Sequence, residues 1–486
     1  MGKILLICGL TLILLPGLGW AKTIYVPQDY PKIQPALDVS EKGDEIKVSP
    51  GTYYENITIP DGRSLVGYDN QNTIIADSGE GPPDAVVTIA GDCVLNGFTV
   101  TGARGAGLGH ALVISRGSPQ VINNIIRDNS YTGIGIHAEM YLTTAFVKGN
   151  QIYGNGGAGI ANYGQHSEST ITKNNIHDNG NAGVVSTYFA SPVIEENTLH
   201  HNSVGVAVRD DALAVINKND ITANKMVGIT VMKNSKARIN GNTLQSNGTV
   251  GVNVDMNSQA EVLNNSVTDN GAEAIYFKGK SKGVVDSNQV SGNFPTIIQF
   301  DQAIVRLTRN MISSIDSPDV SLTISIDRSY CLMGGNEVVG GFSADPLSKV
   351  DDLPPEETAY TPNPLPFWKV AGGLGLPKWQ IPKMTTSKPN QSREMEVGPR
   401  PIDSADTEME EAESEAGIKM DTEVADEAEA GSTDEPTEPT EQPEESEANP
   451  SSESDSAEAA DHAGHSSPAD KVQPKASHIW GCLGFY

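Results

Sequence analysis

The segment Val121-Ile-Asn-Asn-Ile-Ile-Arg-Asp-Asn129 contains the pattern that decides the fold. An aliphatic residue stands at its first and sixth positions, and Asn stands at its fourth and ninth positions. The pattern occurs intact eight times, and successive copies are 22 to 26 residues apart. The first Asn of each copy falls at Asn124, Asn150, Asn174, Asn197, Asn219, Asn242, Asn265 and Asn288.

A period near 23 residues, built of short alternating runs and Asn or Gly turns, is not helical, because no window keeps apolar residues at helical spacing. It is typical of a coil of three short parallel strands. A leucine-rich repeat is excluded, since its fixed leucine pattern is absent. The sequence therefore predicts an all-β fold, a right-handed parallel β-helix solenoid of about ten coils.

The interior of each coil follows from strand geometry, because side chains alternate between the two faces of a strand. The first aliphatic residue, the first Asn and the second aliphatic residue share parity, so we expect all three to point inward. Stacked coils then align Asn amides that donate to and accept from one another. An aliphatic column is predicted beside them at Val121, Val147, Ile171, Ile194, Ile216, Ile239, Val262 and Val285.

The remaining segments flank this solenoid. A short amphipathic helix at 31–41 is predicted to cap its open end, which would otherwise expose apolar interior and strand edges. A Pro-rich segment with Phe367, Trp368 and Trp379 is expected to fold back over the last coil. The predicted organisation is a signal peptide (1–21), a cap with the first coils (22–95), the repeats (96–341), a Pro-rich cap or linker (342–390), an acidic disordered tail (391–476) and an aromatic C-terminal segment (477–486).

The N-terminus has the three parts of a secretory signal. A lysine precedes an apolar run that is too short to span a bilayer, and small residues Gly19 and Ala21 occupy the positions a signal peptidase requires. We expect cleavage after Ala21, no stable membrane span afterwards, and a secreted or periplasmic protein of the cell envelope. An uncleaved anchor is the alternative.

The net charge of −29 is concentrated near the C-terminus. Residues 401–470 hold 24 acidic residues and one lysine, with no aromatic residue, so they are expected to stay disordered. Elsewhere no basic patch stands out, which argues against a nucleic-acid partner.

Three cysteines remain after the predicted signal cleavage, and an odd number does not make a disulfide framework. Cys93 and Cys331 are expected to be buried free thiols near opposite ends of the solenoid. Cys482 lies in the aromatic closing segment, where it is available for a disulfide-linked dimer.

The stretch Thr23-Ile-Tyr-Val-Pro-Gln-Asp-Tyr-Pro-Lys-Ile-Gln-Pro-Ala-Leu-Asp38, followed by 42–57, resembles the opening of pectin-lyase-like β-helix proteins. Pectin methylesterases and the periplasmic copper-site assembly protein of nitrous oxide reductase have similar openings. The resemblance implies an extracytoplasmic superfamily whose enzymes act on acidic polysaccharides. The sequence departs from these enzymes, because it lacks the Gly-His-Gly of polygalacturonases, the Asp-Pro-His of alginate epimerases and the Gly-Arg-Pro-Trp of the esterases.

One outward column is the candidate catalytic surface. It is predicted to contain His137, Tyr163, Thr187, Arg209, Met232, Asp255, Lys278 and Phe300. His137, Tyr163, Arg209 and Asp255 are the candidate catalytic residues, since an acid or base beside a cation that stabilises a sugar carboxylate can move a proton. The alternative is a solvated face with an Asp255–Lys278 pair of little energetic value.

A second outward column runs through Arg127, Tyr153, His177, His200 and Thr222. His177 and His200 are expected to stack one coil apart beside His201, and imidazoles so placed are candidate ligands for copper or zinc. Surface histidines without a metal are the alternative, because no Cys, Met or carboxylate completes the set.

These observations favour a β-helix protein that binds a polysaccharide or a cell-envelope protein along one face, without full catalytic machinery or a cofactor. The first alternative is a polysaccharide lyase, epimerase or hydrolase that acts on acidic glycans. The second is a copper-handling accessory protein, with copper or calcium as the bound ion.

Overall fold

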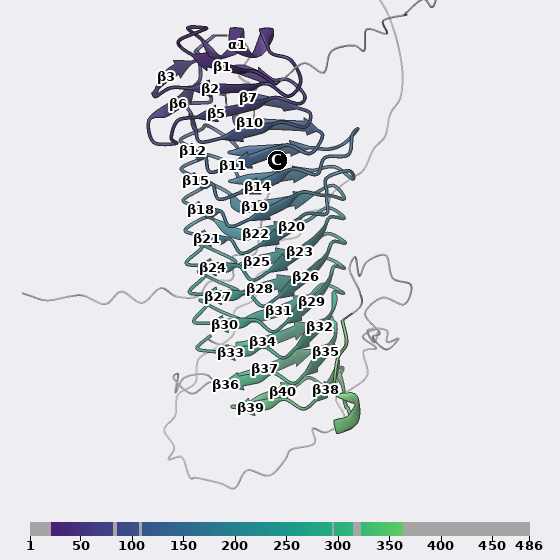
Figure 1. Ribbon diagram of the computed structural model, residues 1–486. Coiled ribbons are helices and arrows are strands. Elements are labelled where there is room, and N and C mark those ends of the chain that lie inside the picture. Colours follow the sequence, from purple (N-terminus) through teal and green to yellow (C-terminus); the bar gives the residue numbers. More distant parts are fainter. Residues whose placement is uncertain (1–20, 81–84, 106–108, 294–295, 314–321, 363–486) are drawn as a thin grey trace, which may run out of the picture. The chain divides into compact units, whose positions relative to one another are not determined.

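The computed structural model describes residues 21–80, 85–105, 109–293, 296–313 and 322–362. In this part the chain winds through three parallel sheets, and each strand pairs with the strand one coil earlier and one coil later (Figure 1). The prediction of a right-handed parallel β-helix is confirmed. The signal segment 1–20, Phe367, Trp368, Trp379, Cys482 and the acidic tail lie outside the described residues.

We label the sheets A, B and C, in the order in which each coil visits them. Sheet A has 15 strands: β1 (Thr23–Val26), β2 (Glu45–Val48), β5 (Ser64–Gly67), β8 (Val94–Asn96), β11 (Gln120–Ile122), β14 (Phe146–Lys148), β17 (Thr170–Thr172), β20 (Val193–Glu195), β23 (Leu213–Asn217), β26 (Lys236–Asn240), β29 (Gln259–Leu263), β32 (Lys282–Asp286), β35 (Ile304–Thr308), β38 (Tyr330–Gly334) and β41 (Lys349–Asp352).

Sheet B has 13 strands: β3 (Gly51–Tyr54), β6 (Thr73–Ala76), β9 (Thr99–Thr101), β12 (Ile125–Arg127), β15 (Gln151–Tyr153), β18 (Asn175–His177), β21 (Thr198–His200), β24 (Asp220–Thr222), β27 (Thr243–Gln245), β30 (Ser266–Thr268), β33 (Gln289–Ser291), β36 (Met311–Ser313) and β39 (Glu337–Val339).

Sheet C also has 13 strands: β4 (Ile57–Ile59), β7 (Ala85–Ala90), β10 (His110–Arg116), β13 (Ile134–His137), β16 (Ile160–Tyr163), β19 (Ala182–Thr187), β22 (Val204–Val208), β25 (Ile229–Val231), β28 (Val252–Val254), β31 (Ile275–Lys278), β34 (Thr296–Asp301), β37 (Leu322–Asp327) and β40 (Phe342–Ala344). There are thus about 13 coils in the described part, not ten. The count from sequence was low because the first and last coils lack the paired Asn by which coils were recognised.

The interior follows the predicted parity. Val121, Asn124 and Ile126 are all fully buried, and the predicted aliphatic column from Val121 to Val285 pairs in register along sheet A. The Asn side chains form two continuous ladders at the corners on either side of sheet B. Each ladder amide donates to the Asn of the next coil and to a backbone carbonyl, so the buried polar groups are satisfied.

One predicted outward residue was wrong. Phe300 pairs with Phe277 in sheet C, and both side chains are fully buried in the core, with ring centroids 6.0 Å apart. The register partner of Lys278 is Asp301, which takes the place predicted for Phe300 in the outward column. A shift of one residue along a strand moves a side chain to the opposite face.

The N-terminal cap is the helix α1 (Ile33–Val39), shorter than the predicted 31–41 but in the expected place. Ile33, Ala36 and Leu37 are buried against the first coils. The carboxylate of Glu55 accepts hydrogen bonds from the backbone N–H groups of Ile33 at 2.8 Å and Gln34 at 3.0 Å. These bonds satisfy donors that the first turn of a helix leaves open.

At the other end, strands β40 and β41 continue the solenoid past Gly341, where the repeat pattern stops. The chain then forms the 3-10 helix η1 (Pro355–Glu357) and returns along the outside of sheet A. We call residues 353–360 the strap. Arg306 on β35 donates to the carbonyl oxygen of Glu357 at 2.6 Å, which attaches the strap one coil above β38.

Both described cysteines, Cys93 and Cys331, are buried and free, as predicted. Burial raises the pKa of the Cys93 thiol to about 12. None of the helices among the described residues is long and apolar enough to span a membrane.

Candidate functional site

The outer face of sheet C presents the candidate column, because alternate residues of its strands point outward. In β13, Ile134 and Ile136 are buried in the core, whereas His137 points out. His137 pairs in register with Tyr163 of β16, and Tyr163 pairs with Thr187 of β19. The predicted order of these three residues along the solenoid is therefore observed.

Four rings meet at the upper end of this column. The rings of His137 and Tyr163 stack with centroids 4.9 Å apart. His110 meets the edges of His137 and Tyr131, with centroid separations of 5.6 and 5.4 Å. We call His110, Tyr131, His137 and Tyr163 the ring cluster. His110 and Tyr131 were not predicted, because the coil that contains His110 lacks the Gly-aliphatic signal that marks this strand elsewhere.

Gly135 makes room for the ring cluster. A Cβ atom at this position would lie 3.0 Å from Nε2 of His137 and 3.2 Å from Nδ1 of His110, so both imidazoles lie close over the glycine. Nε2 of His137 is buried and has no hydrogen-bond partner among the described residues. A buried polar atom without a partner is costly, and such atoms mark places where a ligand or water supplies the missing bond.

The protonation states of the stacked pair differ in a useful way. Burial lowers the pKa of His137 below its ordinary value, although the nearby Glu139 carboxylate, 3.8 Å from Nδ1, opposes this. Burial, with a smaller contribution from Tyr131, raises the pKa of Tyr163 to about 12, and Arg209 opposes this change. At neutral pH His137 is thus a neutral imidazole that can accept a proton, and Tyr163 is a phenol that can donate one.

The lower half of the column is charged. Asp210 accepts from the hydroxyl of Thr187 at 3.0 Å and pairs with Lys233 at 3.0 Å and with Arg209 at 3.6 Å. Three coils' length below Thr187, Asp255 pairs with Lys278 at 3.4 Å, as predicted.

The four predicted catalytic residues do not form one cluster. His137 and Tyr163 are in contact, and Arg209 lies two coils below Tyr163, roughly 10 Å along the solenoid. Asp255 is five coils below His137, roughly 24 Å away at the same spacing, and its charge is paired with Lys278. A small reacting group that contacts His137 and Tyr163 is therefore out of reach of Asp255.

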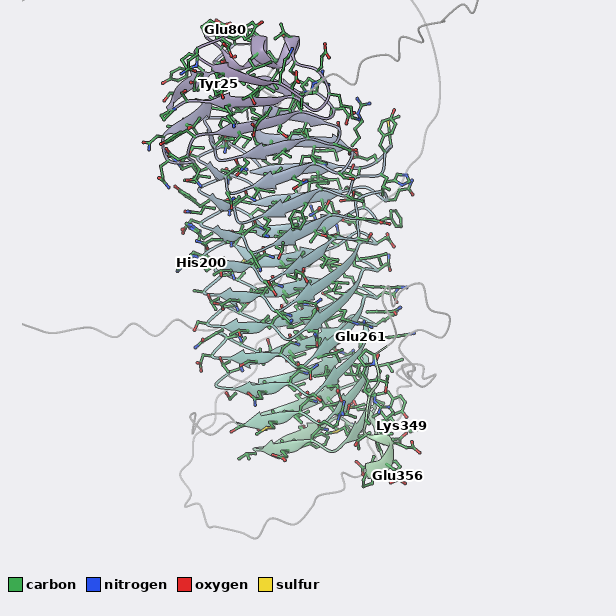
Figure 2. All side chains as sticks on the ribbon, in the orientation of Figure 1. Tyr25, Glu80, His200, Glu261, Lys349 and Glu356 are labelled. Carbon is green, nitrogen blue, oxygen red and sulfur yellow. The ribbon has the colours of Figure 1, made fainter. Side chains whose placement is uncertain are left out.

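The second predicted column is observed on sheet B. The ring of His177 stacks on Tyr153 and on His200, with centroid separations of 4.9 and 4.7 Å. Figure 2 shows His200 at the edge of the solenoid. Nδ1 of His200 lies 2.8 Å from Nδ1 of His201, and burial, followed by His177 and His201, lowers the pKa of His200.

These histidines are already engaged by neighbours. Nδ1 of His177 lies 2.7 Å from the Asp178 carboxylate, and Nε2 of His200 lies 3.1 Å from Oδ1 of Asn175. Across the described ranges, no group of three or more His, Cys, Asp or Glu side chains is placed to hold a metal ion. The donor set at His177, His200 and His201 therefore does not fit copper or calcium, and we derive no step through a metal.

Two family models match parts of this chain. One, described as the right-handed beta helix region, matches residues 163–312. The chain folds as a right-handed parallel β-helix. The other, described as periplasmic copper-binding protein (NosD), matches residues 38–204. No curated protein matches the sequence of this β-helix chain.

Several solved structures resemble the β-helix. The catalytic unit of the thermostable GH87 α-1,3-glucanase from Streptomyces thermodiastaticus strain HF3-3 has 16% identity and a TM-score of 0.50, covering 68% of this chain and 70% of the glucanase. The A-module of mannuronan C-5 epimerase AlgE6 from Azotobacter vinelandii has 16% identity, a TM-score of 0.40 and coverages of 66% and 93%. The periplasmic alginate epimerase AlgG has 14% identity, a TM-score of 0.45 and coverages of 68% and 83%. At these identities the glucanase likeness concerns the fold alone.

Proposed function

We propose that the outer face of sheet C binds a polysaccharide chain outside the cytoplasm. The observation that carries this proposal is the ring cluster, in which the buried Nε2 of His137 lacks a partner beside the space left by Gly135. A sugar hydroxyl is a small group that can both donate to and accept from an imidazole nitrogen. The flat rings beside it offer apolar surface to the C–H groups of a sugar.

The charged part of the column supports an acidic glycan. Arg209 and Lys233 lie below the ring cluster and share one carboxylate, that of Asp210. A guanidinium group can bind a carboxylate through two parallel hydrogen bonds, so Arg209 can accept a uronate in place of Asp210. A glycan lying along the solenoid axis would thus place sugar rings on the ring cluster and a carboxylate near Arg209.

A polysaccharide lyase or epimerase is the second candidate, favoured by the opposite protonation states of His137 and Tyr163. Neutral His137 would take the proton from the carbon next to the uronate carboxylate, so the C–H bond breaks and an N–H bond forms. Tyr163 would return a proton to the opposite face of that carbon, which gives the epimer. In a lyase it would protonate the departing glycosidic oxygen as the C–O bond breaks, leaving an unsaturated uronide.

Affinity electrophoresis against a panel of acidic and neutral polysaccharides tests the binding proposal. We expect retardation by at least one acidic glycan, lost in His137→Ala and weakened in Arg209→Ala. Lys173→Ala is the matched control, because Lys173 forms an exposed ion pair with Glu196 away from sheet C. Binding that survives both site substitutions would exclude this face, and absence of binding to the whole panel would contradict the proposal.

Product analysis on the same samples separates the two candidates. Release of unsaturated uronides or a changed epimer ratio, abolished by His137→Ala and Tyr163→Phe, would make the protein an enzyme. Binding without either product would make it a binding protein.

An extracytoplasmic location is part of the proposal. It is supported by the signal-like N-terminus, by the match to a family model described as periplasmic and by the likeness to a periplasmic epimerase. Fractionation of cells that express the full chain tests it, since a processed protein in the periplasm or medium is expected. A cell-envelope protein remains the alternative partner.

A further inference from the structure

The turns from sheet C to sheet A share one backbone conformation. In four of them the residue after the turn donates its backbone N–H to the carbonyl three positions earlier, at 3.1 to 3.3 Å. The two central residues have positive φ angles between 50° and 67° in five coils: Tyr188–Phe189, Asp210–Asp211, Lys233–Asn234, Met256–Asn257 and Gly279–Lys280. This is the geometry of a type I′ turn.

The Tyr188–Phe189 turn is unusual in its residues. A type I′ turn favours Asn, Asp and Gly, because they tolerate positive φ, and the other four turns each contain at least one of these residues. Tyr188 and Phe189, with φ angles of 52° and 66°, carry a steric cost that bulky side chains normally avoid. Their burial does not offset this cost, since their exposed fractions are 58% and 56%.

The turn lies next to the ring cluster. The hydroxyl of Tyr188 is near enough to that of Tyr163 to contribute to the raised pKa of Tyr163. Two coils above, the loop after β13 carries Tyr141 and Leu142, with exposed fractions of 53% and 57%. The two loops belong to one row, because Thr143 bridges to Ser167 and Ser167 accepts from the backbone N–H of Ser191 at 2.8 Å.

We propose that Tyr141, Tyr188 and Phe189 form a stacking edge on which the sugar rings of the bound polysaccharide pack. This inference rests on the proposed function and extends the glycan site from the outer face of sheet C to its border with sheet A. Strain that no burial offsets is found where a segment serves a ligand. Here the strained turn holds two aromatic rings out beside the ring cluster.

The surroundings favour a sugar over a protein partner. The edge is interrupted by polar side chains, with Gln165 and His166 in the coil between its two loops and Arg209 and Asp210 in the coil below. Aromatic rings that alternate with hydrogen-bonding groups match the C–H faces and hydroxyl groups of a pyranose. A protein interface instead has a closed apolar centre with its polar groups at the rim.

The test replaces the strained turn by the residues its backbone prefers. Tyr188→Asn combined with Phe189→Gly should leave the thermal midpoint unchanged or raise it, since Asn-Gly is a favoured type I′ pair. The dissociation constant for the glycan identified by affinity electrophoresis should rise about tenfold or more, measured by titration calorimetry. Tyr141→Ser, in an exposed loop, should weaken binding in the same direction without a change in stability.

Met256→Asn is the matched control, because Met256 holds the same turn position three coils below Tyr188 and is 51% exposed. It should leave the affinity unchanged. Normal glycan affinity in both edge variants would overturn the stacking edge and leave the proposed function standing, and loss of self-association instead would identify a protein interface. If the wild-type protein binds none of the polysaccharides, the proposed function and this inference fall together.

Discussion

The hydroxyl of Tyr360 donates a hydrogen bond to Oε1 of Glu261, a residue 99 positions earlier in the chain, at 2.5 Å. Glu261 lies in sheet A and is fully buried, and its other carboxylate oxygen pairs with Arg238 one coil above. Figure 2 marks Glu261 well above Glu356 of the strap, which agrees with a chain that turns back along the coils. The strap is therefore attached to the solenoid by a buried charged group.

Replacing Tyr360 by Phe should loosen this attachment. Burial and the Glu261 carboxylate raise the pKa of Tyr360, so the phenol stays a donor across the neutral range. Loss of a hydrogen bond to a buried carboxylate is expected to lower the free energy of unfolding by about 1.5–3 kcal/mol. Urea unfolding measures this, with Tyr68→Phe as the control, because Tyr68 is 79% exposed. Equal midpoints for the two variants would show that the strap bond contributes nothing.

The Asn ladder should be equally sensitive to deletion. Oδ1 of Asn197 accepts from the backbone N–H and the side chain of Asn174, each at 2.9 Å, and Nδ2 donates to Asn219 at 3.0 Å. Asn197→Leu leaves these buried groups unsatisfied, at a cost of about 1–3 kcal/mol for each. Thermal unfolding should therefore shift down. Gln245→Leu, at an exposed amide of β27, is the control, and a shift no larger than that of the control would contradict the ladder's role.

The sequence predicted what repeats from coil to coil and missed what does not. The Asn and aliphatic positions return at a fixed spacing, so their parity identified the interior. Phe300 was misplaced because Lys278 was followed by 22 residues instead of the 23 that match Phe277 to Phe300. The approach of His110 to Gly135 depends on the shape of two turns that occur once each, and no periodic signal reports it.

Lowering the pH should destabilise the fold through His137 and His200, since burial lowers the pKa of both. Below about pH 6.5 the imidazoles of the unfolded chain bind protons that the folded protein binds only at lower pH. The free energy of unfolding therefore falls as the pH drops from 6.5 to the folded-state pKa, and the stabilisation is intact above 6.5.

Thermal midpoints at several pH values across this range check the prediction. His137→Gln and His200→Gln should each flatten the pH dependence, and the double variant should flatten it further, because the two groups lie on different sheets. A double variant with the wild-type slope would assign the pH dependence to other groups.

Gly135→Ala should separate ligand binding from stability. The added Cβ would lie 3.0 Å from Nε2 of His137 and 3.2 Å from Nδ1 of His110, both at the ends of side chains that can move by a few tenths of an ångström. The thermal midpoint should change little, whereas glycan affinity should fall, because the ring cluster is displaced. Gly205→Ala is the contrasting variant: its Cβ would lie 2.5 Å from the backbone oxygen of Gly228, so it should lower the midpoint instead. If Gly135→Ala retains full affinity in calorimetry, the space over Gly135 is not part of the glycan site.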